Sequence, residues 1–290
     1  MKEDLMRYEF EFDVNLSILF TELPLLARPE AAARCGFDAV ELWWPFSGPV
    51  PQDHEHDLLV EALASAGTKL VALNFDAGDM ASGDRGLLSL PKEKERFRSN
   101  IDAVMALAQA TGCRVLNALY GNRDRELDAG VQDDVAMENL LMAAEAARNV
   151  GAVVVLEALN TFENPTYPLS STASTIALIE KARLMGAENV ALLADLYHLA
   201  RMGERLDDSL LTAGKYVRHV QIADIPDRHE PGSGKLGREG LLGPLERARY
   251  RGRVGLEYRP SLASERSFDW LALRAVDDAP LEGAAAAGNL

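Results

Sequence analysis

The chain has very few cysteines, and their positions exclude a disulfide framework. Cys35 and Cys113 are the two cysteines among 290 residues, and no Cys-x-x-Cys pair occurs. Small secreted domains and cysteine-based zinc sites need more cysteines at closer spacing. Each cysteine adjoins a glycine at an expected helix–strand junction, which is typical of a small buried residue. This usage fits a reducing compartment, and we predict a cytoplasmic location.

Basic residues are scarce relative to acidic ones. Lys and Arg number 30 against 45 Asp and Glu, so the formal net charge is −15. Such a chain repels phosphate backbones and anionic lipid surfaces, and we expect no nucleic-acid partner. Long apolar runs are also missing, and Met1–Asp13 is rich in charge. We therefore expect neither a membrane span nor a secretory leader.

What the chain does have is a regular alternation of β-rich and amphipathic helical runs. Eight such units in about the length of one barrel predict a single (β/α)8 TIM barrel over residues 1–276, with 277–290 as a loose Ala- and Gly-rich tail. An open doubly wound sheet is the alternative, but no glycine-rich phosphate loop follows the first expected strand. The expected strands are 10–19, 38–43, 69–74, 114–119, 153–159, 190–195, 217–222 and 253–257. The expected helices are 24–35, 53–66, 91–111, 131–150, 171–185, 206–213, 238–248 and 265–275.

Four consecutive strands end in a side chain that can bind a metal ion. Glu157, Asp195, Gln221 and Glu257 close the fifth to eighth strands, each between apolar neighbours. Carboxyl ends of barrel strands meet at one mouth, so we expect these four to converge there. Buried carboxylates are costly unless paired or bound to a cation, and oxygen ligands favour Mg²⁺ or Mn²⁺. The pattern predicts a divalent metal site, with scattered ion pairs to Lys or Arg as the alternative.

Two histidines and an arginine are expected near this mouth. His198 follows Asp195 by three residues, which predicts contact with a substrate oxygen or a role in proton transfer. His219 should lie one layer deeper than Gln221 on the same side of its strand. Arg228, in the loop after the seventh strand, is either a bidentate clamp for a substrate carboxylate or a surface charge.

Polar residues of the first three strands are further candidates for the mouth. Asn15 and Ser17 share one strand face, Glu41 lies in the second strand, and Asn74 ends the third. We expect Asn15 and Asn74 to contact substrate. The Trp43-Trp44 pair is expected to pack between barrel and helices.

Several longer motifs give the chain a specific family resemblance. From about residue 12 to 270 it resembles the hydroxypyruvate isomerases, including their 2-oxo-tetronate isomerase branch, which are xylose-isomerase-like barrels. The motifs that carry the resemblance are Asn-Leu-Ser-Ile-Leu-Phe-Thr-Glu at 15–22, Gly-Phe-Asp-Ala-Val-Glu at 36–41, the loop 77–86, Glu-Ala-Leu-Asn at 157–160, Asp-Leu-Tyr-His at 195–198, His-Val-Gln-Ile-Ala-Asp at 219–224, Arg-His-Glu-Pro-Gly at 228–232 and Gly-Leu-Glu-Tyr at 255–258.

The resemblance implies a division of labour among the candidate residues. Glu157 and Glu257 are implied as the acid/base pair, and both are implied to bind the metal with Asp195 and Gln221. His198 and Arg228 are implied to contact the substrate. The implied reaction moves a carbonyl along a small 2-oxo or hydroxy sugar acid through an enediolate, for example from hydroxypyruvate to tartronate semialdehyde. The implied partner is thus a small sugar acid, and a homo-oligomer is compatible with the sequence.

Departures from the family pattern border the expected pocket and bear on substrate identity. They are Leu193-Ala194, Leu199–Arg201, the Trp-Trp-Pro-Phe turn at 43–46 and the loop 161–169. A ketose 3-epimerase and an inosose dehydratase are therefore alternatives on the same barrel. A DNA-repair endonuclease of related fold needs a histidine-rich site and a basic face, which five histidines and a net charge of −15 disfavour. A non-catalytic sugar-binding protein is the remaining alternative.

Overall fold

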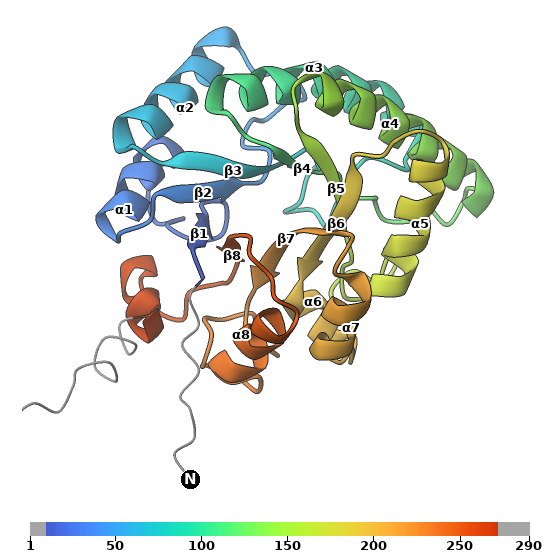
Figure 1. The fold of residues 1–290 in the computed structure, drawn as a ribbon. Coiled ribbons are helices and arrows are strands. Elements are labelled where there is room, and N and C mark those ends of the chain that lie inside the picture. The colour runs from blue at the N-terminus through green and yellow to red at the C-terminus, as the bar shows by residue number, and fades with distance from the viewer. Residues whose placement is uncertain (1–9, 272–290) are drawn as a thin grey trace, which may run out of the picture.

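The computed structural model describes residues 10–271, which form a closed barrel of eight parallel strands in chain order. Figure 1 shows the helices arranged around the outside of this ring of strands. The strands are β1 Phe12–Asn15, β2 Ala39–Leu42, β3 Lys69–Asn74, β4 Val115–Asn117, β5 Val153–Glu157, β6 Val190–Asp195, β7 Val217–Ile222 and β8 Val254–Leu256. The helices are α1 Arg28–Arg34, α2 Asp53–Ala66, α3 Lys94–Thr111, α4 Ala129–Asn149, α5 Thr172–Leu184, α6 Leu196–Arg201, α7 Leu206–Ala213 and α8 Gly237–Arg247, with short 3-10 turns at Leu25–Ala27, Pro91–Glu93 and Ser264–Phe268.

The predicted barrel is confirmed, and the differences lie at element ends. The strand predicted at 10–19 stops at Asn15, because the Asn15 side chain accepts a hydrogen bond from the Ser17 amide and turns the chain. Helix α6 was not predicted; the Asp195 carboxylate caps it by accepting from the Tyr197 amide. Of the helix predicted at 265–275, the structure shows a 3-10 turn at Ser264–Phe268 followed by helical residues 269–271, and 272–275 lie outside the described residues. The tail 277–290 lies outside the described residues.

Strand alternation divides the apolar residues into two layers. On β5 and β6, Val154 and Leu192 face the helices as part of the large outer core. Their neighbours face inward and form a small cluster inside the barrel, made of Ala72, Val115, Val155, Ala191 and Leu193. This alternation places Glu157 and Asp195 on the inward face at the ends of the same two strands.

The opposite side of the barrel interior is polar. Asp13, Glu41 and His219 point inward there from β1, β2 and β7, and all three are buried. Gly255 on β8 leaves the space that they need, because a β-carbon at this position would come within 1.9 Å of the Glu41 carboxylate. The apolar cluster packs one side of the barrel interior, and the polar group on the other side contacts Gln221, nearer the carboxyl ends of the strands.

Within residues 10–271 no helix is both long and apolar enough to cross a membrane.

Candidate active site at the carboxyl ends of the strands

A cavity of about 610 Å³ opens at the carboxyl ends of the strands. Its lining includes Ser17, Asn74 and His198. Glu157 and Glu257 also line it, and Trp43 lies beside Glu257. Arg85, Arg228 and Arg259 also reach the cavity. The cavity therefore combines carboxylates and arginines in a space large enough for a small molecule.

Glu257 is held by donors from three different segments. Its Oε1 accepts hydrogen bonds from Asn15 Nδ2 at 2.9 Å and from Trp43 Nε1 at 2.7 Å. Its Oε2 pairs with Arg228 Nη2. These contacts fix the carboxylate at the cavity wall and leave it little rotational freedom.

Glu157 faces Glu257 across the cavity floor. Its Oε2 accepts from Asn117 Nδ2 at 2.7 Å, and its Oε1 lies 3.9 Å from His198 Nε2. Burial, followed by the negative charges of Glu257 and Asp195, raises the pKa of the Glu157 carboxyl well above its ordinary value. The site thus brings negative charges together at a position that calls for a proton or a cation.

Asp195 lies between these two glutamates. Its Oδ2 is 3.4 Å from Arg228 Nη2 and 3.5 Å from His198 Nε2. Burial raises the pKa of Asp195 to about 7, although the charge of Arg228 opposes the increase. Asp195 and Glu257 therefore share one guanidinium as their cationic partner.

His198 is a neutral donor that points at the carboxylates. Its Nδ1 accepts from the Asn160 backbone amide at 3.1 Å and lies 2.8 Å from the Asn160 side-chain amide. Burial, aided by repulsion from Arg228, lowers the pKa of His198 well below its ordinary value. The neutral ring therefore carries its proton on Nε2, which faces Asp195 and Glu157.

The loop that carries Arg228 is organised by Asp224. The Asp224 carboxylate accepts hydrogen bonds from five backbone amides, those of Ile225, Gly232, Gly234, Leu236 and Gly237. Residues 232–237 have the G-x-G-x-x-G spacing of a phosphate-binding loop. Four backbone amides of this segment, at 232, 234, 236 and 237, instead donate to the Asp224 carboxylate. The network holds Arg228 in the left-handed backbone region, at φ 61°, with its guanidinium over Tyr197.

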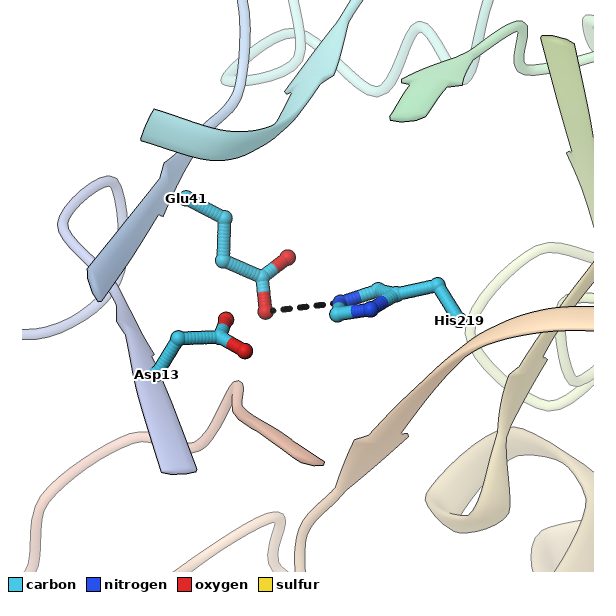
Figure 2. A group of neighbouring side chains, drawn as sticks. All are labelled: Asp13, Glu41 and His219. Carbon is cyan, nitrogen blue, oxygen red and sulfur yellow. Dashed lines mark hydrogen bonds and ion pairs between the residues drawn. The ribbon is translucent and has the colours of Figure 1, made fainter. Parts of the chain in front are cut away.

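Gln221 is supported from below by the polar half of the barrel. Its Nε2 donates to Glu41 Oε2 at 2.6 Å, while its Oε1 is buried and has no hydrogen-bond partner among residues 10–271. His219 Nε2 lies 3.2 Å from Glu41 Oε1, and the Asp13 carboxyl lies beside them (Figure 2). Because Glu41 binds Nε2 of the Gln221 amide, the Oε1 atom faces away from Glu41.

Two groups of side chains have the composition and spacing of metal ligands. One is Glu157, Asp195 and His198 at the cavity floor, and the other is Asp13, Glu41 and His219 beneath it. Both oxygens of Asp13 are buried without a hydrogen-bond donor in the described part of the chain. Burial, followed by the charge of Glu41, raises the pKa of Asp13 well above its ordinary value, and burial raises that of Glu41 to about 8. We predict that Asp13 and Glu41 share a proton, which would supply the donor that the Asp13 carboxyl lacks.

Because of this carboxyl pair, stability is expected to fall as pH rises. A carboxyl whose pKa is raised on folding contributes most below its unfolded pKa of about 4 and loses that contribution as pH rises through the folded value. The free energy of unfolding is measured with urea, in the presence of chelator, at pH 5 to 8.5. We expect its decrease over this pH range to be smaller in Asp13→Asn than in wild type, by on the order of 1–3 kcal/mol. Asp102→Asn, an exposed change on α3, is the control. An unchanged pH slope in Asp13→Asn would contradict the shared proton.

The structure brings together most of the residues that the sequence singled out. Asn74, Glu157, His198, Arg228 and Glu257 line the cavity. Asp195 and Gln221 lie buried behind them, and Asn15 reaches the site through its bond to Glu257. His219 lies one layer deeper, as predicted. Their roles toward metal and substrate stay predictions.

Two expectations were wrong. Trp43 does not serve packing alone, because its indole N–H holds Glu257. Glu41 does not line the mouth, because it lies beneath Gln221 and is almost fully buried. Sequence reasoning also passed over Asn117, which binds Glu157 and ends β4 just as Asn74 ends β3. The strand-end rule that selected Asn74 applies equally to Asn117.

Comparison with known proteins gives consistent matches over most of the chain. The xylose isomerase-like TIM barrel model matches residues 29–274. A Streptomyces coelicolor relative is 51% identical over 264 residues, covering 90% of this chain and 95% of the relative. The hydroxypyruvate isomerase of Escherichia coli is 33% identical and the 2-oxo-tetronate isomerase of Pectobacterium atrosepticum 32%, with 90% of this chain and 97% and 96% of the relatives covered.

Solved structures agree on the fold. A Brucella melitensis protein described as a family 2 AP endonuclease is 34% identical, with a TM-score of 0.82 over 91% of this chain and 99% of that chain. The D-psicose 3-epimerase of Clostridium cellulolyticum shares the barrel with a TM-score of 0.71 at 19% identity, covering 92% and 97% of the two chains. The barrel with acidic residues at its strand ends is thus a xylose isomerase-like TIM barrel of the isomerase class. Within it, the chain belongs to the hydroxypyruvate isomerase family.

Proposed function

We propose that the protein is a metal-assisted isomerase of a small 2-oxo or hydroxy sugar acid, such as hydroxypyruvate or a 2-oxo-tetronate. One observation carries the proposal: two glutamates, Glu157 at the end of β5 and Glu257 directly after β8, face one cavity, each held by side-chain donors. An isomerase that moves a carbonyl by one carbon must take a proton from one carbon and return one to its neighbour, and two carboxylates facing one cavity can share this work. The names of the relatives support the substrate class.

The residues present fit a divalent cation. Glu157, Asp195 and Glu257 bring three carboxylates to the cavity floor, where Arg228 Nη2 contacts two of them. Gln221 adds a buried amide oxygen that lacks a donor in the described chain. This set of oxygen atoms matches the preference of Mg²⁺ or Mn²⁺. The neutral His198 presents Nε2–H to the carboxylates and is therefore a donor rather than a ligand.

The chain's own groups account for binding and proton transfer. One glutamate removes a proton from the carbon that carries the hydroxyl, and the other delivers a proton to the former carbonyl carbon, by way of an enediolate of the substrate. The proton of the substrate hydroxyl passes to the former carbonyl oxygen, so the reaction neither gains nor loses a proton. His198 Nε2–H is placed to donate to a substrate oxygen, and Asn74 and Arg228 line the same space. When bound, the metal supplies Lewis-acid stabilisation of the negative charge that develops on the substrate oxygens.

Glu41 is expected to set metal affinity through Gln221. Glu41→Leu removes the acceptor that orients the Gln221 amide, so we expect Mn²⁺ affinity to fall about 10- to 100-fold. Glu41→Gln keeps an acceptor oxygen and serves as the matched control, with a smaller loss expected. Isothermal titration calorimetry with Mn²⁺ measures both variants. Equal affinities in wild type and Glu41→Leu would show that the amide needs no support.

A substrate panel tests the proposed reaction directly. Hydroxypyruvate, 2-oxo-tetronates and neutral ketoses are incubated in D₂O, and NMR follows both conversion and proton exchange. Conversion of the acids supports the proposal, whereas conversion of neutral ketoses alone favours a ketose 3-epimerase. Dehydration of an inosose, or absence of turnover with every compound, rejects it as well. A nuclease is not favoured, because His198 is the single histidine of the cavity lining.

A further inference from the structure

Two arginines at the cavity have no carboxylate within ion-pair distance among the described residues, although the chain is strongly acidic. Arg85 follows β3 in the long loop and Arg259 follows Glu257 by two residues, and both line the cavity. Arg96 and Arg247 pair with aspartates, whereas exposed Arg251 has no such partner in the described chain but lies away from the cavity. Among residues 10–271, no carboxylate lies within ion-pair distance of Arg85 or Arg259. In a chain with net charge −15, two unpaired cations at one cavity indicate an anionic ligand.

The loop holds Arg85 in a defined position. Its Nη1 donates to the Met80 carbonyl at 3.0 Å and the Asp84 carbonyl at 2.6 Å. The Arg85 carbonyl accepts from the Gly121 amide at 3.0 Å. Gly86 follows at φ 106°, and a β-carbon there would lie 2.0 Å from the Leu119 carbonyl oxygen. One edge of the half-buried guanidinium is thus anchored by backbone oxygens, and the loop is pressed against the end of β4.

The charges of the cavity also favour an anion near Arg85. With a divalent cation bound, the carboxylates of Glu157, Asp195 and Glu257 are balanced by that ion and Arg228. Glu163 is the one further acid in the lining, and its carboxylate accepts from the Asn160 side chain at 2.7 Å. Burial, with repulsion from Arg228, lowers the pKa of Arg85. The rim therefore carries an excess of positive charge.

We propose that Arg85, with Arg259 beside it, binds the carboxylate of the substrate and makes the enzyme select acids over neutral sugars. Arg228 is poorly suited to this task, because its Nη2 already contacts Glu257 and Asp195. The inference rests on the proposed function for its orientation, with the carbonyl and hydroxyl groups between the two glutamates and the carboxylate at the rim. A guanidinium suits this role because it binds carboxylates through parallel hydrogen bonds.

Binding of matched inert probes tests the subsite without turnover. Affinities of the metal-loaded protein for glycerate and for glycerol, in which a hydroxymethyl group replaces the carboxylate, are measured by calorimetry. We expect Arg85→Gln to weaken glycerate binding about 10-fold or more and to change glycerol binding less than about twofold. Arg85→Lys should retain part of the preference, and Arg259→Gln should have a smaller effect. Arg251→Gln, at an exposed position preceding β8 at the opposite end of the barrel, removes the same charge and should change neither affinity.

The outcomes separate the subsite from the proposed reaction. A preference for glycerate that persists unchanged in both Arg85→Gln and Arg259→Gln overturns the subsite, as does equal weakening of both probes. Kinetics then provide the second readout: KM for hydroxypyruvate should rise in Arg85→Gln with kcat little changed. If the wild type isomerises no 2-oxo acid, the proposed function fails, while the comparison of glycerate with glycerol still decides the subsite.

Discussion

Replacing Glu257 by glutamine is expected to leave the barrel folded and to lower turnover about 10²- to 10⁴-fold. Glutamine has nearly the same shape, and its carbonyl oxygen can still accept from Asn15 and Trp43. It cannot accept a proton from carbon, and it removes the negative charge that pairs with Arg228. The loss should therefore appear in kcat, with the thermal midpoint changed little.

The measurement is isomerisation in D₂O, followed by NMR for product formation and for exchange at each carbon. Glu188→Gln, an exposed change just before β6 at the opposite end of the barrel, is the matched control and should retain wild-type turnover. Glu157→Gln should also lose product formation. If the two glutamates serve different carbons, one of the variants retains exchange at a single carbon. Near-wild-type turnover in Glu257→Gln would refute the proposed mechanism.

The fold was predictable because the sequence repeats a β-rich run followed by a helical run eight times, as a (β/α)8 barrel requires. Strands β3, β6 and β7 begin and end at the residues predicted from the sequence. The inward direction of Glu157, Asp195 and Gln221 follows from their place at strand ends, and strand alternation placed His219 beneath Gln221. Such features depend on neighbours in the sequence, so local reasoning finds them.

Contacts between distant segments were not predictable in the same way. Trp43 holds Glu257 across 214 positions of sequence, and Gln221 binds Glu41 across 180. An indole beside an apolar strand has the same local pattern whether it packs or donates a hydrogen bond. The fold decides between these roles when closure of the barrel pairs β8 with β1, which itself pairs with β2. The lack of an ion pair at Arg85 also could not be predicted from the sequence, because it depends on the distances that the fold sets between Arg85 and the acidic side chains.

Removal of divalent metal is expected to abolish turnover, with recovery on addition of Mn²⁺ or Mg²⁺. The physical reason lies at the cavity floor, where burial and mutual repulsion raise the pKa of Glu157 and bring that of Asp195 to about 7. Without a cation these groups retain protons, and a protonated glutamate cannot serve as a base. A bound divalent ion displaces those protons and restores the carboxylates.

Metal content, stability and turnover should therefore change together. The protein is chelated exhaustively, its metal content is verified by elemental analysis, and its thermal midpoint and turnover are followed during Mn²⁺ titration. Metal at 100 times its dissociation constant should stabilise the fold by about 2.7 kcal/mol. Gln221→Leu removes one oxygen ligand and should shift both titrations to higher Mn²⁺ concentration by the same factor. Full turnover in verified metal-free protein would leave the two glutamates as an unaided acid/base pair, and the buried Gln221 oxygen would then need another partner.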